Sequence, residues 1–222
     1  MQTARTRIER RLGRRVVGYR SPRLDRSPDL AWALDHSDFA YDSSYPDVDR
    51  ENIAHFGGGV RLNVPYRPLV RDAAGGLRTS RCLELPLTAP DCIQPLFGGQ
   101  TLAALRSAVA TKAAFLRATG GLYVALVHAG VFGDHDAAVR EDHLQFVCSQ
   151  LRHADVWLAT LGQIAAWWRQ REALRLSRRD GTVVIRNDGA EPIAGVQVVI
   201  ERDGDSTTLT LPPLAAGAET VL

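Results

Sequence analysis

Two kinds of apolar pattern alternate along the first 173 residues. Short runs with aromatic or β-branched residues predict strands, and segments whose apolar residues recur at helical spacing predict helices. The predicted strands are 15–19, 39–41, 83–87, 122–130 and 156–159, and the predicted helices are 2–12, 28–34, 100–118, 136–151 and 160–172. Strands that alternate with helices of ten or more residues predict parallel β–α units. The segment 46–82 lacks either pattern and predicts a long loop.

The pattern changes at residue 174, after which no helical period remains. Alternating runs separated by Asn-Asp-Gly and Asp-Gly-Asp predict antiparallel strands joined by tight turns; the runs are 182–185, 196–200 and 207–211. We therefore predict two domains, an α/β domain at 1–173 and a small, β-sandwich-like antiparallel appendage at 174–222. The appendage is interpreted as a structural cap, with binding of a carbohydrate or of a partner as the alternative.

The composition is typical of a soluble globular protein, with 222 residues, 45% hydrophobic and 23% charged. A net charge of +2 is too small to indicate a nucleic-acid or membrane partner. The arginine-rich start predicts a solvated helix face, with nucleic-acid binding as the alternative. The three cysteines form no Cys-x-x-Cys pair, and the polar N-terminus has no signal-peptide core, so we predict a cytoplasmic protein by default, with a signal peptide in a missing N-terminal region as the alternative.

The apolar run 122–130 is the first place where the sequence suggests chemistry. It predicts a buried strand that ends on His128, followed by a small residue and a glycine. Loops at the end of such a strand can surround a substrate while the strand holds the titratable group still. A histidine that only caps the strand is the alternative interpretation.

Five short motifs follow one another along the first domain. They are 18–22 (Gly-Tyr-Arg-Ser-Pro), 41–44 (Tyr-Asp-Ser-Ser), 84–86 (Glu-Leu-Pro), 126–128 (Leu-Val-His) and 157–161 running into 167–169. In order and spacing they resemble the polysaccharide deacetylases with a NodB-homology domain, of the carbohydrate esterase family 4 type. The resemblance covers about residues 10–173. It implies a distorted (β/α) barrel, of which this chain would hold the C-terminal part.

The resemblance implies hydrolysis of the acetamido C–N bond of N-acetylated sugars. In this family a divalent metal such as zinc activates a water, an aspartate acts as base and a histidine protonates the leaving amine. His128 matches that histidine, and Arg20 matches the arginine that holds the base. Asp42 occupies the acidic motif that tunes the histidine.

The resemblance also implies three substrate contacts. Leu126 matches the apolar residue that lines the acetyl pocket, and the backbone N–H of Arg23 lies where the family has its oxyanion donor. Tyr45, beside the acidic motif, is the third predicted contact. The expected ligand is therefore an N-acetylated sugar.

The family's metal motifs, an aspartate pair and His-x-x-x-His, belong before Arg20, where this chain has neither His nor Asp. His135 and His143 are eight positions apart, about 12 Å along a helix, which does not suit one zinc. We therefore predict that this chain encodes no metal site or other cofactor. A partial barrel has open strand edges, which the appendage, a second copy or a partner chain would cover.

Three hypotheses remain open at this point. The chain is part of a sugar deacetylase, truncated and without its metal site; it is a non-catalytic carbohydrate-binding or interaction protein; or it is one half of a split deacetylase whose partner supplies the metal. The first accounts best for the order of the motifs.

Overall fold

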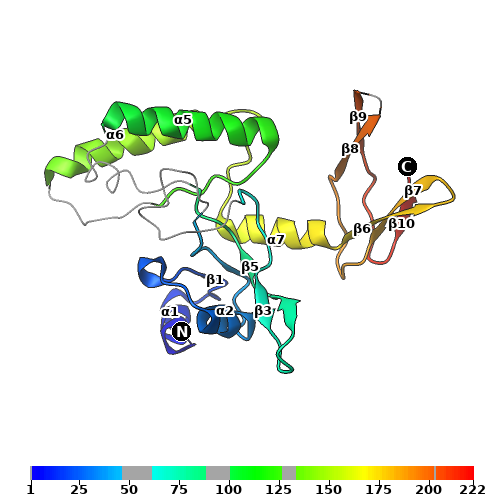
Figure 1. Ribbon diagram of the computed structural model, residues 1–222, viewed down its shortest axis with the longest axis horizontal. Coiled ribbons are helices and arrows are strands. Elements are labelled where there is room, and N and C mark those ends of the chain that lie inside the picture. Colours follow the sequence, from blue (N-terminus) through cyan, green and yellow to red (C-terminus); the bar gives the residue numbers. More distant parts are fainter. Residues whose placement is uncertain (1, 47–61, 89–100, 127–133, 203) are drawn as a thin grey trace. The chain divides into compact units, whose positions relative to one another are not determined.

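The structure, a computed structural model, describes residues 2–46, 62–88, 101–126, 134–202 and 204–222. The chain forms two compact units, Met1–Ala165 and Ala166–Leu222. Helices and strands are mixed in the first unit, and strands dominate the second (Figure 1). The predicted α/β class is confirmed at this level. The domain boundary at 173 stays a prediction, since the division between the units falls inside α7 (Leu161–Glu172).

Three short strands form the parallel sheet of the first unit. They are β1 (Gly18–Tyr19), β2 (Tyr41–Asp42) and β5 (Leu83–Glu84), in the order β1-β2-β5. The register pairs Tyr19 with Asp42, and Asp42 with Glu84. Within the described ranges these strands make an open sheet and no closed barrel, so the partial barrel stays a prediction.

Helix α2 (Pro28–Asp35) connects β1 to β2 and begins as its sequence predicts. Ser27 caps it by accepting a hydrogen bond from the Leu30 N–H, at 3.0 Å, and proline occupies the first helical position. The helix buries Leu34 in a small core with Phe39 and Cys82. This core lies beside the parallel sheet and holds α2 against β1 and β2.

Helix α1 (Gln2–Leu12) turns an arginine toward the protein. Arg5 is buried, its guanidinium lies 5.0 Å from the centre of the Phe39 ring, and its Nε donates to Glu9 Oε1 at 2.9 Å. Ile8 and Leu12 are about half exposed. At least one arginine of the basic segment is therefore structural rather than part of a solvated face.

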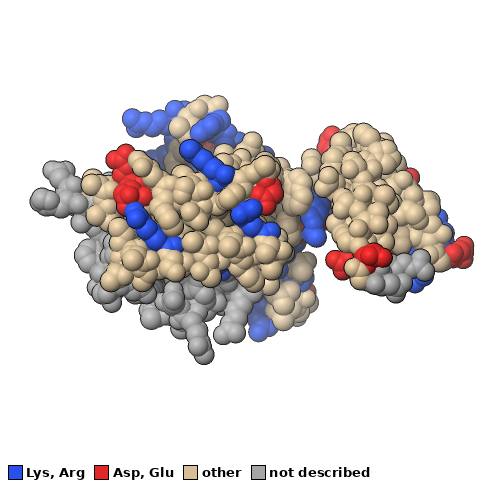
Figure 2. Space-filling model, turned by 90° about the horizontal axis from the view of Figure 1, so that it is seen from above, with Lys and Arg blue, Asp and Glu red and all other residues tan. Residues whose placement is uncertain are grey.

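Helices α5 (Leu102–Thr119) and α6 (Asp134–Leu151) lie side by side (Figure 1), where helices were predicted at 100–118 and 136–151. Arg106 pairs with Asp142 between them, and its guanidinium lies 5.2 Å from the Phe146 ring centre. Acidic and basic side chains are interspersed on the face of this unit seen in Figure 2. Among the helices described, none is long and apolar enough to cross a bilayer.

Two sequence predictions for this unit need correction, and a third lies partly outside the described residues. The expected loop 46–82 contains a hairpin, β3 (Leu69–Arg71) and β4 (Leu77–Thr79), closed by the turn around Gly75. The segment 156–159 is not a strand. Of the run 122–130, only 122–126 is described, and there Val124 exchanges hydrogen bonds with Thr88 of the segment after β5, at 3.0 and 2.6 Å.

The second unit is antiparallel, as predicted from its alternating pattern. Its sheet has the order β10-β7-β6, built from β6 (Leu174–Arg179), β7 (Thr182–Asn187) and β10 (Glu219–Val221). β8 (Gln197–Arg202) and β9 (Asp205–Thr210) form a separate hairpin. Asp180 and Gly181, both with positive φ, form the tight turn between β6 and β7. The predicted Asn-Asp-Gly turn at 187–189 does not join two paired strands, since β7 pairs with β6 and β10. Ile185, Leu211 and Leu214 form the core.

Asn187, at the end of β7, holds the loops of the second unit together. Its fully buried amide donates to the carbonyl oxygens of Glu191, Leu214 and Ala215 at 2.9, 3.1 and 3.2 Å. Its Oδ1 accepts from the Gly189 N–H at 2.9 Å. One side chain therefore satisfies the main chain of two separate loops.

Replacement of Asn187 by alanine is expected to lower the stability of the second unit by about 2 kcal/mol, because buried carbonyl groups lose their donor. Hydrogen exchange of the β6 and β7 amides measures this loss. Asp188→Ala is the control, because this carboxylate makes only exposed ion pairs and should cost less than about 1 kcal/mol. Equal losses in the two variants would contradict the role assigned to Asn187.

Candidate functional site

The candidate site lies at the carboxyl ends of β1, β2 and β5. Parallel strands bring the residues that follow them to one edge of the sheet, which is where α/β folds bind ligands. Arg20 follows β1, the segment 43–45 follows β2, and Asp42 and Glu84 are the last residues of β2 and β5. The side chains of Arg20, Asp42 and Glu84 form one largely buried polar cluster.

Arg20 is held by the turn that follows β2. Its Nε donates to the Ser43 carbonyl and its Nη2 to Ser43 Oγ, both at 2.8 Å. The Ser21 N–H donates to Ser44 Oγ, also at 2.8 Å. Burial lowers the pKa of Arg20, while the charges of Asp42 and Glu84 act in the opposite direction. The motifs 18–22 and 41–44 are thus bonded to each other.

Asp42 is buried and only half of its carboxyl group is satisfied. Its Oδ1 accepts from the Ser43 N–H at 2.8 Å and from Ser44 Oγ at 2.6 Å. Its Oδ2 is buried and accepts no hydrogen bond from an N–H or hydroxyl group of the described residues, which leaves the Glu84 carboxyl group as its neighbour. Burial raises the pKa of Asp42 above its ordinary value, although the hydrogen bond from Ser44 opposes this.

Glu84 is the neighbour of Asp42 in the sheet and is fully buried. Its Oε1 accepts from the N–H groups of Ser44 and Tyr45, at 3.0 and 2.9 Å, and its Oε2 is buried without a partner in the described part of the chain. Burial, and then the charge of Asp42, raise the pKa of Glu84 to about 9. Because two adjacent buried carboxylates repel each other, we expect the two carboxyl groups to share one proton at neutral pH.

Sequence reasoning did not assign Glu84 to the site, although its motif was part of the family resemblance. One signal was available in the sequence. Glu84 lies between Leu83 and Leu85, which are fully buried, in a short apolar strand. A charged residue inside such a strand requires a partner at its own level of the sheet.

The cavity beside the two carboxyl groups is small. A cavity of about 10 Å³ is lined by Asp42, Tyr45 and Glu84, with Leu34 and Cys82 on its apolar side. This volume accommodates one water molecule and no sugar. The carboxyl pair is thus an interior element that shapes the edge of the sheet, and a substrate would lie outside it.

Two predicted substrate contacts lie beside this cluster. The Tyr45 ring is half-buried, and the Arg26 guanidinium lies 5.4 Å from its centre. Arg23 has a φ of 57° and Leu24 the same, a conformation that costs energy in residues other than glycine. Among the described residues, the Arg23 N–H makes no hydrogen bond. Its role as an oxyanion donor stays a prediction.

The two remaining predicted residues lie in or beside the run 122–130. Leu126 is half-buried, and His128 lies outside the described residues. The structure thus brings Arg20, Asp42 and Tyr45 together, with Arg23 on the adjoining turn, and does not place His128.

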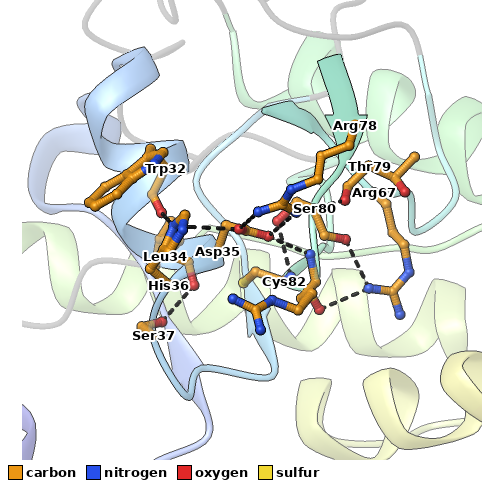
Figure 3. Close-up of polar contacts among 11 residues, drawn as sticks. Trp32, Leu34, Asp35, His36, Ser37, Arg67, Arg78, Thr79, Ser80 and Cys82 are labelled. Carbon is orange, nitrogen blue, oxygen red and sulfur yellow. Dashed lines mark hydrogen bonds and ion pairs between the residues drawn. The ribbon is translucent and has the colours of Figure 1, made fainter. Parts of the chain in front are cut away.

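A second polar cluster, around Asp35, supports the strand that carries Glu84 (Figure 3). Asp35 is buried at the end of α2, pairs with Arg78 of β4 and accepts from the Arg81 N–H at 2.7 Å. Its hydrogen bonds with Arg78 hold the pKa of Asp35 well below the ordinary range. Arg67 donates to the carbonyls of Ser80 and Arg81 at 3.0 and 2.8 Å. These contacts fix the segment that leads into β5.

His36 lies at the exposed side of this second cluster. Its Nδ1 is 2.8 Å from the Trp32 carbonyl oxygen and 3.5 Å from Asp35 Oδ2, and its ring stacks on Trp32 at 4.1 Å. Because a carbonyl oxygen only accepts, Nδ1 carries the proton. These contacts of His36 cap the C-terminal end of α2. Among the described residues, no nucleophilic side chain lies beside the imidazole.

The metal that the resemblance implies does not fit the residues described. No group of three or more His, Cys, Asp or Glu side chains is found among them. The two unpartnered carboxyl oxygens of Asp42 and Glu84 are the nearest approach to a ligand set. A catalytic zinc needs three converging ligands, and the Arg20 cation beside this pair opposes a metal there.

Comparisons with known proteins add one likeness in fold. No protein-family model matches this chain, and no curated protein does. A crystal structure from Mycobacterium smegmatis, of a protein provisionally assigned as a polysaccharide deacetylase, is similar with 24% sequence identity and a TM-score of 0.48. The alignment covers 81% of this chain and 59% of the other, so this chain spans about three fifths of that protein. At this level the likeness carries no argument about the site.

Proposed function

We propose that this chain takes part in the hydrolysis of acetamido groups on sugars, as a relative of the polysaccharide deacetylases. The observation that carries the proposal is the direct bonding between the motifs that follow β1 and β2, Arg20 with Ser43 and Ser21 with Ser44. These motifs lie 23 positions apart in the sequence. Their contact at the carboxyl edge of a parallel sheet is the arrangement that a substrate site in an α/β fold requires.

In the proposed reaction, water adds to the carbonyl carbon of the acetamido group and the C–N bond breaks. The nitrogen leaves with a proton donated by His128, and the products are acetate and an amino sugar. Arg20, fixed by Ser43, orients the carboxylate that accepts the proton of the water. Asp42 is a positioning residue in this proposal, because its carboxyl group is closed into the interior pair with Glu84.

The acetyl group would lie between the turn that follows β1 and the segment that contains Leu126. Tyr45 and Leu126 would contact its methyl group, and the Arg23 N–H would donate to the developing oxyanion. The positive φ of Arg23 supports this part of the proposal, because strained turns persist where the surrounding structure uses them.

In this proposal the metal ligands and the base come from outside the described residues. They would belong to a second chain, as in a split deacetylase, or to another part of the same protein. We derive no step through the metal from the residues in hand.

Acetate release from chitohexaose tests the proposed function. Two preparations are compared: the chain by itself, and the chain co-expressed with a neighbouring gene segment that carries the Asp-Asp and His-x-x-x-His motifs. We expect zinc-dependent release only from the second. In that preparation His128→Ala should lower the rate at least about 100-fold, as expected for the loss of a general acid. Phe115→Ala, at an exposed aromatic residue on α5, is the control and should leave the rate unchanged.

Two outcomes would contradict parts of the proposal. Zinc-dependent release by the chain alone would contradict the assignment of the metal ligands to a second chain. Chitohexaose binding that survives both metal chelation and His128→Ala, without acetate release from either preparation, would favour a non-catalytic carbohydrate-binding protein.

A further inference from the structure

The second unit contains a cavity of about 610 Å³ that is unrelated to the site at β1, β2 and β5. Small-ligand sites in proteins have volumes of about 300–1,000 Å³. One wall is the C-terminal half of α7, a second is β6 with β7, and the third is the segment 193–199, which leads into β8. All three walls belong to Ala166–Leu222, so the cavity lies within one compact unit.

The helix supplies an aromatic surface and polar groups to this cavity. Trp167 lines it with 48% of its surface exposed, next to Gln170, Arg171 and Glu172. The Arg171 guanidinium lies 4.7 Å from the centre of the Trp168 ring, and the rings of Trp167 and Trp168 are 6.0 Å apart. Stacking on Trp168 restricts Arg171, so its N–H groups have a defined position at the cavity.

The opposite walls are apolar in their side chains and polar in their main chain. Leu176 and Val199 line the cavity with 66% and 56% of their surface exposed. Ala194 and Gly195 are exposed, and within the described residues their N–H groups make no hydrogen bond. Exposed apolar side chains beside available polar groups are typical of a ligand site.

The charges along the cavity balance. Arg171 contributes one positive and Glu172 one negative charge, and Gln170 is neutral. On the face seen in Figure 2, the atoms of the second unit are mostly uncharged. A nucleic acid or an acidic polymer would require an excess of basic residues, which this cavity does not have.

We propose that this cavity binds a neutral sugar chain. A pyranose ring has an apolar C–H face, which suits the exposed indole of Trp167, and hydroxyl groups around its rim. Gln170, Arg171 and Glu172 provide donors and acceptors for those hydroxyls, and charged partners strengthen such bonds. This inference rests on the second unit alone and is independent of the proposed hydrolysis. It would give the chain a means of holding a polymer whether or not it is catalytic.

The test is isothermal titration calorimetry of the whole chain with chitohexaose, cellohexaose, maltohexaose and hexagalacturonate. We expect at least one neutral hexamer to bind with a Kd below about 1 mM. Trp167→Ala should weaken that binding at least tenfold, and Gln170→Ala by a smaller factor. The matched control is Trp157→Ala, at a tryptophan of similar exposure (56%) in the first unit, which should leave the Kd unchanged.

Several outcomes would overturn the inference. They are no binding of any neutral hexamer, unchanged binding in Trp167→Ala, and tighter binding of hexagalacturonate than of the neutral sugars. If Trp167→Ala unfolds, the sugar affinity of Gln170→Ala tests the inference instead. The Gln170 side chain is exposed and carries no core contact, so its removal should not unfold the chain. If neither preparation releases acetate but the chain still binds a neutral hexamer, the result counts against the proposed hydrolysis and not against the sugar site in the second unit.

Discussion

Replacement of Glu84 by leucine is expected to destabilise the first unit by about 4 kcal/mol at pH 5. Leucine would suit the apolar strand β5, but it accepts no hydrogen bond, so the buried N–H groups of Ser44 and Tyr45 would lose their acceptor. Each unsatisfied buried donor costs about 1–3 kcal/mol. Hydrogen exchange of the amides in β1, β2 and β5 measures the change within this unit.

Glu84→Gln is the matched variant, because its side chain has the shape of the protonated acid. The amide oxygen can still accept from Ser44 and Tyr45, and the amide nitrogen can donate to Asp42 Oδ2. At pH 5 this variant should therefore be within about 1 kcal/mol of the parent. A loss as large as that of Glu84→Leu would show that hydrogen bonding to the turn is not what Glu84 contributes.

A comparison of the parent with Glu84→Gln also tests a predicted pH dependence of stability. The pKa of Glu84 rises from an ordinary 4.5 to about 9 on folding, so between these values the folded state holds a proton that the unfolded state has released. Stability is then expected to fall as pH rises through this range, with a loss of several kcal/mol between pH 5 and pH 8. Glu84→Gln lacks this proton, and its stability should exceed that of the parent at pH 8. Parallel profiles would contradict the shared proton.

Asp35→Ala should cost the first unit about 3 kcal/mol at pH 7. The substitution leaves Arg78 without its carboxylate and leaves the Arg81 N–H without an acceptor. The cost sums several hydrogen bonds to one buried carboxylate, each worth about 1 kcal/mol, while the Arg78 side chain is 36% exposed and is partly rehydrated. Urea unfolding followed by circular dichroism measures the loss.

Asp38→Ala is the control for this prediction. Asp38 also pairs with arginines, at 3.5 and 3.9 Å, but its side chain is 72% exposed, so its removal should cost less than about 1 kcal/mol. The pKa of Asp35 lies below its ordinary 3.8, so its contribution is present above about pH 4 and is lost as pH falls further. The difference between parent and Asp35→Ala should therefore narrow below pH 4. A constant difference would show that the carboxylate charge is not responsible.

Periodicity predicted the elements whose burial follows a simple pattern. Helix α2 has a serine cap, a proline at its first position and a buried Leu34, and each is visible in the sequence. The alternating strands of the second unit are equally local signals. The predicted strand at 156–159 failed, because a short apolar run forms a strand only where a neighbour offers hydrogen bonds, and no residue pattern shows that neighbour.

The candidate site was predictable in part. The motifs around Arg20 and Asp42 identified two of its members, since their residue types and order match a known family. Their bonding through Ser43 and Ser44 could not be predicted, because it depends on the register between β1 and β2. Glu84 was not assigned to the site for the same reason. The role of an acidic residue in an apolar strand can be assigned only once its neighbour on the adjacent strand is known.

The sequence by itself determined the α/β class, the change of pattern near residue 174 and the position of the motifs at strand ends. Each of these depends on contacts between residues close along the chain. Only the tertiary structure decided that Asp42 and Glu84 are buried neighbours in the sheet, that Arg5 is buried and that the second unit contains a cavity beside Trp167. These features depend on burial and on distances between segments remote in sequence. Burial sets the pKa of a carboxyl group and the chemistry of a cavity, and periodicity carries no information about either.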